Sequence, residues 1–127
     1  MKLLLDTHTV IWIDSDPGQL SRAASSALQD PSNTKYLSVV SVWEIIIKTQ
    51  SGKLTLYQPL ARLLSDQVAN GVQILPVLLP HVLGVDSLPQ IHKDPFDRLL
   101  AAQAIVEDAE FVTADRVFAQ YPVRILW

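Results

Sequence analysis

KLLLDTHTVIW, residues 2–12, is the stretch from which the fold can be predicted. Residues 3–5 form a short apolar run without alternation, which is typical of a strand buried on both faces of a parallel sheet. The run stops at Asp6, and from Thr7 onward the apolar residues take up helical spacing. An acid therefore stands where a central strand ends and a helix begins. That edge is where open α/β sheets bind their ligands.

Strands and helices alternate along the rest of the chain. Further strands are predicted at 35–40, 72–77, 110–113 and 123–126, and further helices at 22–28, 41–50, 60–69, 80–88, 95–106 and 116–120. Ser41 and Glu44 form an S-x-x-E capping pattern, so one helix is expected to begin at Ser41. That helix is apolar nearly all round, which predicts that it is largely buried. The alternation predicts an α/β/α sandwich with a mainly parallel sheet.

Composition narrows the classes of protein that the chain can belong to. Its 127 residues predict a single domain, 1–127, and 49% hydrophobic residues suffice for a core. No apolar run is long enough to span a bilayer, Asp6 and His8 interrupt any signal-like segment, and cysteine is absent, so a cytoplasmic protein is expected. The net charge of -3 argues against a large nucleic-acid surface, although metal-loaded acids can reverse the local charge.

Four acids repeat one arrangement. Asp6 and Asp115 each follow an apolar strand, and Glu44 and Asp97 stand near helix starts that follow strands. Each has a local explanation: a helix cap for the first two, a capping box or a pair with Lys48 for Glu44, and a first-turn acid for Asp97. In a parallel sheet, however, all four positions share one edge. Carboxylates gathered there repel one another, which predicts a cation, and oxygen ligands favour Mg²⁺ or Mn²⁺.

Neighbouring residues provide candidates for supporting roles. Thr113 is placed to donate a hydrogen bond to a nearby carboxylate. His8 is expected to contact a substrate or to hold Asp6, or else to be solvated or packed. Arg98 and Arg116 flank the acids and are expected to hold a phosphate or to form salt bridges. Asp94, before Pro95, is expected to be a helix cap. The three histidines form no metal-ligand pattern, and phosphate-binding glycine loops are absent.

Four segments carry a resemblance to a known family. LLLDTHTVIW, SVVSVWEIIIK, DPFDRLLAAQA and FVTADRVF resemble, in order and spacing, the acidic motifs of PIN-domain nucleases, and more narrowly those of VapC-like toxins of toxin–antitoxin pairs. The resemblance implies a three-layer α/β/α PIN-like fold and Mg²⁺- or Mn²⁺-dependent endoribonuclease activity. It also implies a homodimer and inhibition by a cognate antitoxin, whose segment would pack along an apolar groove and reach the acids with a basic side chain.

The resemblance assigns roles position by position. Asp6, Glu44, Asp97 and Asp115 match the four acids, as catalytic residues and metal ligands, and Thr113 matches the hydroxyl residue before the fourth acid. The chain departs from the family at two positions. Val117 stands where many members carry another acid, which leaves the number of metals open. His8 stands where a small polar residue is common.

The leading hypothesis is hydrolysis of an RNA phosphodiester by metal-activated water, without a covalent intermediate. One alternative is an aspartyl-phosphate phosphotransfer enzyme, which usually needs a second aspartate two residues after the first, where His8 stands. The other is a receiver-like signalling module with a Mg²⁺ pocket. That module would call for a lysine at a late strand end, but the late strands end in Thr113 and Trp127.

Overall fold

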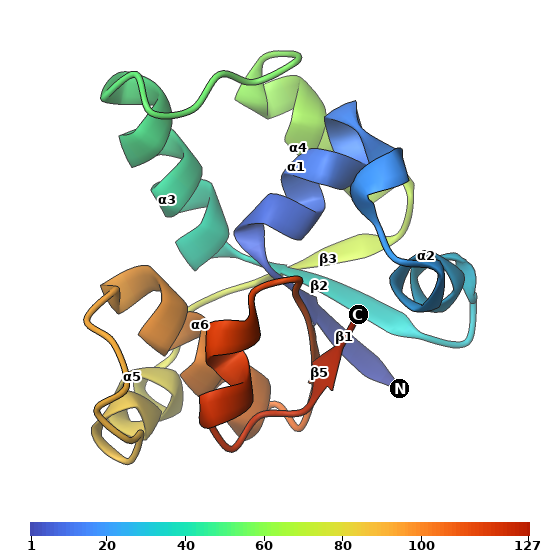
Figure 1. Ribbon diagram of the computed structural model, residues 1–127. Helices are drawn as coiled ribbons and strands as arrows, with labels where there is room; N and C mark the ends of the chain where they lie inside the picture. The colour runs from blue at the N-terminus through green and yellow to red at the C-terminus, as the bar shows by residue number, and fades with distance from the viewer.

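A computed structural model describes all of residues 1–127, and its elements alternate along the chain as predicted (Figure 1). The strands are β1 (Lys2–Leu5), β2 (Thr34–Ser38), β3 (Val72–Leu75), β4 (Glu110–Val112) and β5 (Ile125–Leu126). The α-helices are α1 (Thr7–Ser15), α2 (Arg22–Gln29), α3 (Val39–Gln50), α4 (Leu60–Ala69), α5 (Leu79–Asp86) and α6 (Pro95–Val106). Two 3₁₀ turns, η1 (Pro17–Gln19) and η2 (Arg116–Gln120), complete the set.

The five strands form one sheet in the order β3-β2-β1-β4-β5, and every neighbouring pair is parallel. The first strand of the chain is therefore the central one, with Leu4 paired between Tyr36 of β2 and Phe111 of β4. This confirms the predicted parallel α/β fold. No helix is both long enough and apolar enough to cross a membrane.

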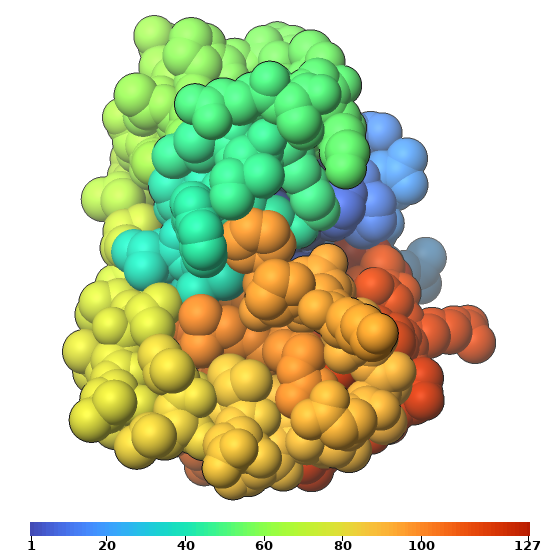
Figure 2. Space-filling model, turned by 90° about the vertical axis from the view of Figure 1, so that its left-hand side faces the viewer, coloured from blue at the N-terminus to red at the C-terminus, as the bar shows by residue number.

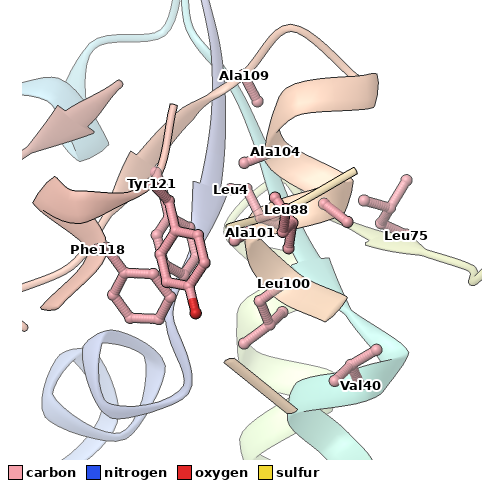
Figure 3. Close-up of a cluster of buried hydrophobic side chains, with 12 residues drawn as sticks. Leu4, Val40, Leu75, Leu88, Leu100, Ala101, Ala104, Ala109, Phe118 and Tyr121 are labelled. Atoms are coloured by element: carbon pink, nitrogen blue, oxygen red, sulfur yellow. The ribbon is translucent and has the colours of Figure 1, made fainter. Parts of the chain in front are cut away.

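Alternate side chains of β1 supply the two halves of the core. Leu4 packs with α6 and with the aromatic rings of Phe118 and Tyr121, as Figure 3 shows. Leu3 and Leu5 point to the opposite face, into a second cluster with residues of α1, α2 and α4. In Figure 1, α1 and α4 lie above the sheet and α5 and α6 lie below it. Because both faces are covered, the strand is apolar at every position after Lys2.

The start of α3 differs from the prediction. The strand before it ends at Ser38, whose Oγ accepts a hydrogen bond from the Val40 N–H at 3.0 Å and caps the helix. Ser41 is buried inside the first turn instead of capping it. Two valines follow the capping serine, so the apolar run spans the strand end and the helix start and conceals the boundary. The predicted capping box between Ser41 and Glu44 does not form.

The prediction that α3 is largely buried is also wrong. Trp43 is 57% exposed, and Ile46 and Ile47 are each more than one-third exposed. The exposed apolar side chains of α3 therefore belong to a surface that the sheet does not cover.

Two of the predicted strands were too long. The strand predicted at 72–77 ends at Leu75, just before Pro76, and the strand predicted at 123–126 shortens to Ile125–Leu126.

Candidate active site

Asp6 is held in place from three directions at the carboxyl end of β1. Its backbone N–H continues the sheet by donating to the Val112 carbonyl at 3.0 Å. One carboxylate oxygen accepts from the Thr7 N–H at 2.8 Å, which caps α1. The other accepts from the Thr113 hydroxyl at 2.7 Å, as predicted. The side chain is only 7% exposed, so the cap and the candidate catalytic acid are the same residue.

Glu44 extends from α3 toward the same point and is only 3% exposed. The Thr7 hydroxyl lies 2.6 Å from its Oε1, and the Lys48 ammonium pairs with its Oε2. The pairing with Lys48 one turn along the helix was one of the two local explanations considered from the sequence. A buried carboxylate needs such partners, because an unpaired charge in the interior costs several kcal/mol.

Asp94 and Asp97 divide two tasks at the start of α6. Asp94 caps the helix, accepting from the Phe96 N–H at 2.9 Å and the Asp97 N–H at 3.1 Å, which confirms the predicted cap. Asp97 lies in the first turn, and its Oδ2 lies 3.2 Å from Nε2 of His92. Asp94 therefore fixes the turn from which the Asp97 side chain projects.

Asp115 lies at the rim, after β4. Its N–H donates to the Thr113 hydroxyl at 3.0 Å, and its Oδ1 accepts from the Val117 N–H at 3.0 Å, so it caps η2. Its side chain is exposed. Thr113 thus joins the first and fourth acids through a single hydroxyl, which accepts from one residue and donates to the other.

The four predicted acids line one pocket of about 470 Å³ at the carboxyl ends of the strands. The lining residues are Asp6, His8, Trp12, Glu44, Lys48, Asp94, Asp97, Ala114 and Asp115. Figure 2 views this side of the molecule, where the green surface of α3 meets the orange surface around the start of α6 and the blue N-terminal segment lies behind them. The sequence-based expectation that these acids share one edge agrees with this placement.

Two of the carboxylates in the pocket have raised pKa values. Burial raises the pKa of Asp97 to about 6, and the nearby charges of Asp94, Asp6 and Glu44 add to the rise, although the His92 hydrogen bond opposes it. Burial also raises the pKa of Asp6, against the hydrogen bond from Thr113. The loss of solvent around these two carboxylates therefore outweighs the hydrogen bonds that the protein gives them.

One ammonium group partly offsets the negative charge of the pocket. Burial acts to lower the pKa of Lys48, but the hydrogen bond and the charge of Glu44 outweigh it and raise this pKa. Asp94 and Asp97 act in the same direction. Lys48 is consequently a resident cation on the wall of the pocket.

The donor chemistry fits a hard divalent cation. As the side chains stand, no three acidic or histidine groups form a cluster that could hold a metal ion. Protein donors bind carboxylate oxygens instead: Lys48 on Glu44, Thr113 on Asp6 and His92 on Asp97. The pocket nevertheless offers several carboxylates against one ammonium, and oxygen donors with excess negative charge suit Mg²⁺ or Mn²⁺.

Not all the predicted supporting residues reach this pocket. Arg98 turns away from it: its guanidinium is buried against the Pro89 carbonyl, at 2.9 Å, and forms no salt bridge. Successive helix positions point about 100° apart, so Asp97 and Arg98 diverge. Arg116 is exposed and does not line the pocket. His8 does line it, whereas Val117 packs against the core.

His92 was not among the predicted site residues. It stands in the loop before α6, five residues ahead of Asp97, and its contact with that acid depends on how the loop folds. Only its position near the D-P-F-D segment, in the sequence HKDPFD, could have drawn attention to it.

Solved structures with a similar fold are toxin–antitoxin proteins. VapBC2 of Rickettsia felis, bound to a DNA fragment from its promoter, has a chain that matches with a TM-score of 0.71 and 17% identity, covering 98% of this chain and 96% of that one. DNA-bound VapBC of Salmonella typhimurium matches with a TM-score of 0.66 and 21% identity, over 98% and 96% of the two chains. At these identities the similarity establishes the fold.

The family follows from the sequence comparisons. Residues 3–123 match the PIN domain family. Ribonuclease VapC22 of Mycobacterium tuberculosis is 30% identical over 115 residues, which cover 90% of this chain and 87% of that protein. The chain belongs to the PIN-domain family and, within it, to the VapC ribonucleases, as the resemblance of the four acidic motifs implied. This membership favours the nuclease hypothesis over the phosphotransfer and signalling alternatives.

Proposed function

We propose that residues 1–127 act as one PIN nuclease domain that hydrolyses RNA phosphodiesters with Mg²⁺ or Mn²⁺, as the toxin of a toxin–antitoxin pair. The observation that carries the chemistry is the pocket that brings the buried carboxylates of Asp6 and Glu44 together with the half-buried carboxylate of Asp97, where burial raises the pKa of Asp6 and of Asp97. The kinship with a named ribonuclease supports RNA as the substrate. The cytoplasmic location expected from the sequence stays a prediction.

In this proposal the acids divide the work. Asp6 and Asp97 would hold the cation directly, and Glu44 and Asp115 would complete its shell. A bound Mg²⁺ or Mn²⁺ would lower the pKa of the attacking water and stabilise the charge that builds on the phosphate. Glu44 or Asp115 orients that water for direct attack, since no serine, cysteine or histidine group in the pocket is arranged as a nucleophile with its base. Thr113 keeps the Asp6 carboxylate turned toward the pocket through its 2.7 Å hydrogen bond.

Positive groups for holding RNA are few and local. Lys48 lines the pocket, and Lys93 is exposed in the loop just before the Asp94 cap. Arg98, another candidate from the sequence, is committed to internal partners. Substrate selection by the shape of a single-stranded or looped RNA suits so small a basic surface.

Cleavage of a total RNA pool by the purified protein is the direct test of this function. We expect discrete cuts with Mg²⁺ or Mn²⁺, none with EDTA, and none with the Asp6→Asn variant at any metal concentration. Mapping the ends of the cut fragments would identify the target. Metal-independent cleavage, or full activity of the folded Asp6→Asn variant, would contradict the proposed role of the acids.

An apolar groove beside the pocket supports the proposed antitoxin partner. It has a volume of about 760 Å³ and lies between α3, α4 and the edge strand β3, and eight of its nine lining residues are hydrophobic. They are Val39, Val42, Trp43, Ile46, Leu64, Ser65, Val68, Ala69 and Ile74. Trp43 in the groove also packs against Phe96 at the start of α6, with ring centroids 5.0 Å apart, and Phe96 directly precedes Asp97. We expect an antitoxin segment seated in this groove to extend past Trp43 and reach the acids with a basic side chain.

A second apolar surface supports the proposed homodimer. It lies on α5 and the end of α6, on the opposite side of the sheet from α4, where Leu79, Val82, Leu83, Ile105 and Val106 are exposed. Gly84 lets the two helices approach closely, since a Cβ there would lie 3.4 Å from Ala102 Cβ and from Val106. Exposed patches of this kind mark contact surfaces.

One arginine substitution on each apolar surface, measured for both antitoxin binding and dimerisation, tests both partner assignments. Val68→Arg should weaken binding of the cognate antitoxin by at least about tenfold, because a guanidinium in an apolar interface is costly to desolvate, and should leave the dimer intact. Val82→Arg should do the reverse. Titration calorimetry with the antitoxin and light scattering of the free protein measure the two effects. Equal antitoxin affinity of Val68→Arg and wild type would contradict the groove assignment.

A further inference from the structure

His92 connects the active-site pocket to the buried core. Its Nε2 lies 3.2 Å from Asp97 Oδ2, and its Nδ1 lies 2.6 Å from the Tyr121 hydroxyl. Its ring also packs against Phe118 and Tyr121, with centroids 6.2 Å and 5.5 Å away. Both ring nitrogens are thus engaged, and the ring is held from its face as well as from its edges.

Tyr121 is a rigid support for this contact. Its side chain is buried in the cluster around Leu4, and Figure 3 shows its hydroxyl at the end of the ring that points away from Ala109. Arg98 reaches the same hydroxyl, with Nη1 at 3.4 Å, while also donating to the Pro89 carbonyl at 2.9 Å. The arginine therefore binds both Tyr121 and the start of the loop that carries His92.

The hydrogen bonds that link Arg98, Tyr121, His92 and Asp97 all run in one direction, from donor to acceptor. An ionised carboxylate only accepts, so Nε2 of His92 carries a proton and donates to Asp97 Oδ2. In the neutral imidazole Nδ1 is then an acceptor, so the Tyr121 O–H donates to it, while the Tyr121 oxygen accepts from the Arg98 guanidinium. A nitrogen that carries this proton is not available as a metal ligand. Asp97 Oδ1 is left without a hydrogen-bond partner from the protein.

We propose that His92 is a positioning residue, which, held in place by Tyr121 and Arg98, holds Oδ2 of Asp97 so that Oδ1 faces the divalent cation. This inference rests on the proposed function, because it assigns a role at the same site. Hydrogen bonds behind a metal-binding carboxylate orient it, and their removal commonly lowers metal affinity or activity by about 10- to 100-fold. Arg98, which the sequence suggested as a phosphate ligand, thereby supports the site indirectly, through the Tyr121 hydroxyl and the loop that carries His92.

Manganese binding to the antitoxin-free protein tests the inference without relying on catalysis. Electron paramagnetic resonance titration with Mn²⁺ should give a Kd weakened by about 10- to 100-fold in His92→Phe. His92→Gln, whose amide can still donate to Asp97, should recover most of the affinity. Tyr121→Phe removes only the hydroxyl and should give an intermediate loss. Tyr57→Phe, at an exposed tyrosine remote from the pocket, is the matched control and should bind like wild type.

Kinetics separate positioning from contact with RNA. The rates of His92→Phe and Tyr121→Phe should return toward wild type at saturating Mn²⁺, while the KM for RNA stays unchanged. A raised KM that excess Mn²⁺ does not correct would overturn the inference, since His92 would then contact the substrate. Unchanged Mn²⁺ affinity in Tyr121→Phe, together with wild-type affinity in folded His92→Phe, would also overturn it.

The inference and the proposed function fail in different ways. If wild type cuts RNA and Asp97→Asn loses Mn²⁺ binding, but the His92 variants bind Mn²⁺ normally, only the positioning role is wrong. If wild type binds Mn²⁺ but cuts no RNA, the proposed function is wrong, and the ratio of Mn²⁺ affinities still decides the role of His92. If His92→Phe does not fold, Tyr121→Phe decides it, because the loss of its hydroxyl alone should weaken Mn²⁺ binding.

Discussion

Replacing Asp97 with Asn is expected to abolish RNA cleavage, leaving less than about one-thousandth of the wild-type rate. The substitution keeps the size of the side chain and the donor–acceptor contact with His92, but it removes the charge that would hold the cation. Single-turnover cleavage of the mapped RNA target at saturating Mg²⁺ measures the loss. Asp86→Asn, at an exposed acid on α5, is the matched control and should keep full activity.

The same substitution should stabilise the metal-free protein at neutral pH. The raised pKa of Asp97 means that the folded state resists the charge that Asp97 carries above pH 6. Asn never carries it, so the free energy of unfolding should rise on the order of 1–3 kcal/mol. Calorimetry in EDTA would show this rise. Wild-type cleavage by the folded variant, or an inactive variant with a collapsed melting temperature, would contradict the assignment of Asp97.

The contribution of Asp97 to the stability of the metal-free protein should fall as the pH rises from about 4 to 7. Folding raises the pKa of the Asp97 carboxyl from its ordinary value of 3.8 to about 6. Between these values the folded state binds more protons than the unfolded state, so each upward step in pH favours unfolding. The contribution from Asp97 is on the order of 1–3 kcal/mol by neutral pH. The raised pKa of Asp6 acts in the same direction.

Metal should reverse that loss. A cation that binds only the folded state stabilises it by mass action, and it does so most where the carboxylates are ionised. Melting curves at pH 5 and 7.5, in EDTA and in Mg²⁺, should show the larger Mg²⁺ effect at pH 7.5. Subtracting the Asp97→Asn curves isolates the contribution of this residue. A metal-free difference between wild type and variant that grows as the pH falls would contradict the sign of the shift.

The strand-end acids could be predicted from the sequence because their placement depends on local pattern. A short apolar run followed by an acid places that acid at the carboxyl edge of a parallel strand, and Asp6 and Asp115 both follow this rule. The D-P-x-D pattern likewise identified Asp94 as a cap, and with it the turn that carries Asp97. Composition and alternation were then enough to predict the parallel sheet.

Other features depend on contacts between distant segments. Whether Arg98 faces the pocket or the core is decided by the Pro89 and Val85 carbonyls, which belong to a loop and to α5. His92 meets Asp97 only after its loop has packed on Tyr121. The exposure of α3 depends on α3 projecting beyond the sheet, because an apolar helix has the same periodicity whether a core or a partner covers it.

The order of the strands in the sheet determines when the enzyme can fold during its synthesis on the ribosome. The central strand β1 is synthesised before its neighbours. Strand β4, and the Thr113 hydroxyl that donates to Asp6, are synthesised much later, because Thr113 lies 107 residues after Asp6. Until residue 115 has left the exit tunnel, β1 lacks one flank and the pocket lacks its fourth acid. A nascent chain of this protein therefore cannot assemble its nuclease centre before all of residues 1–115 are outside the ribosome.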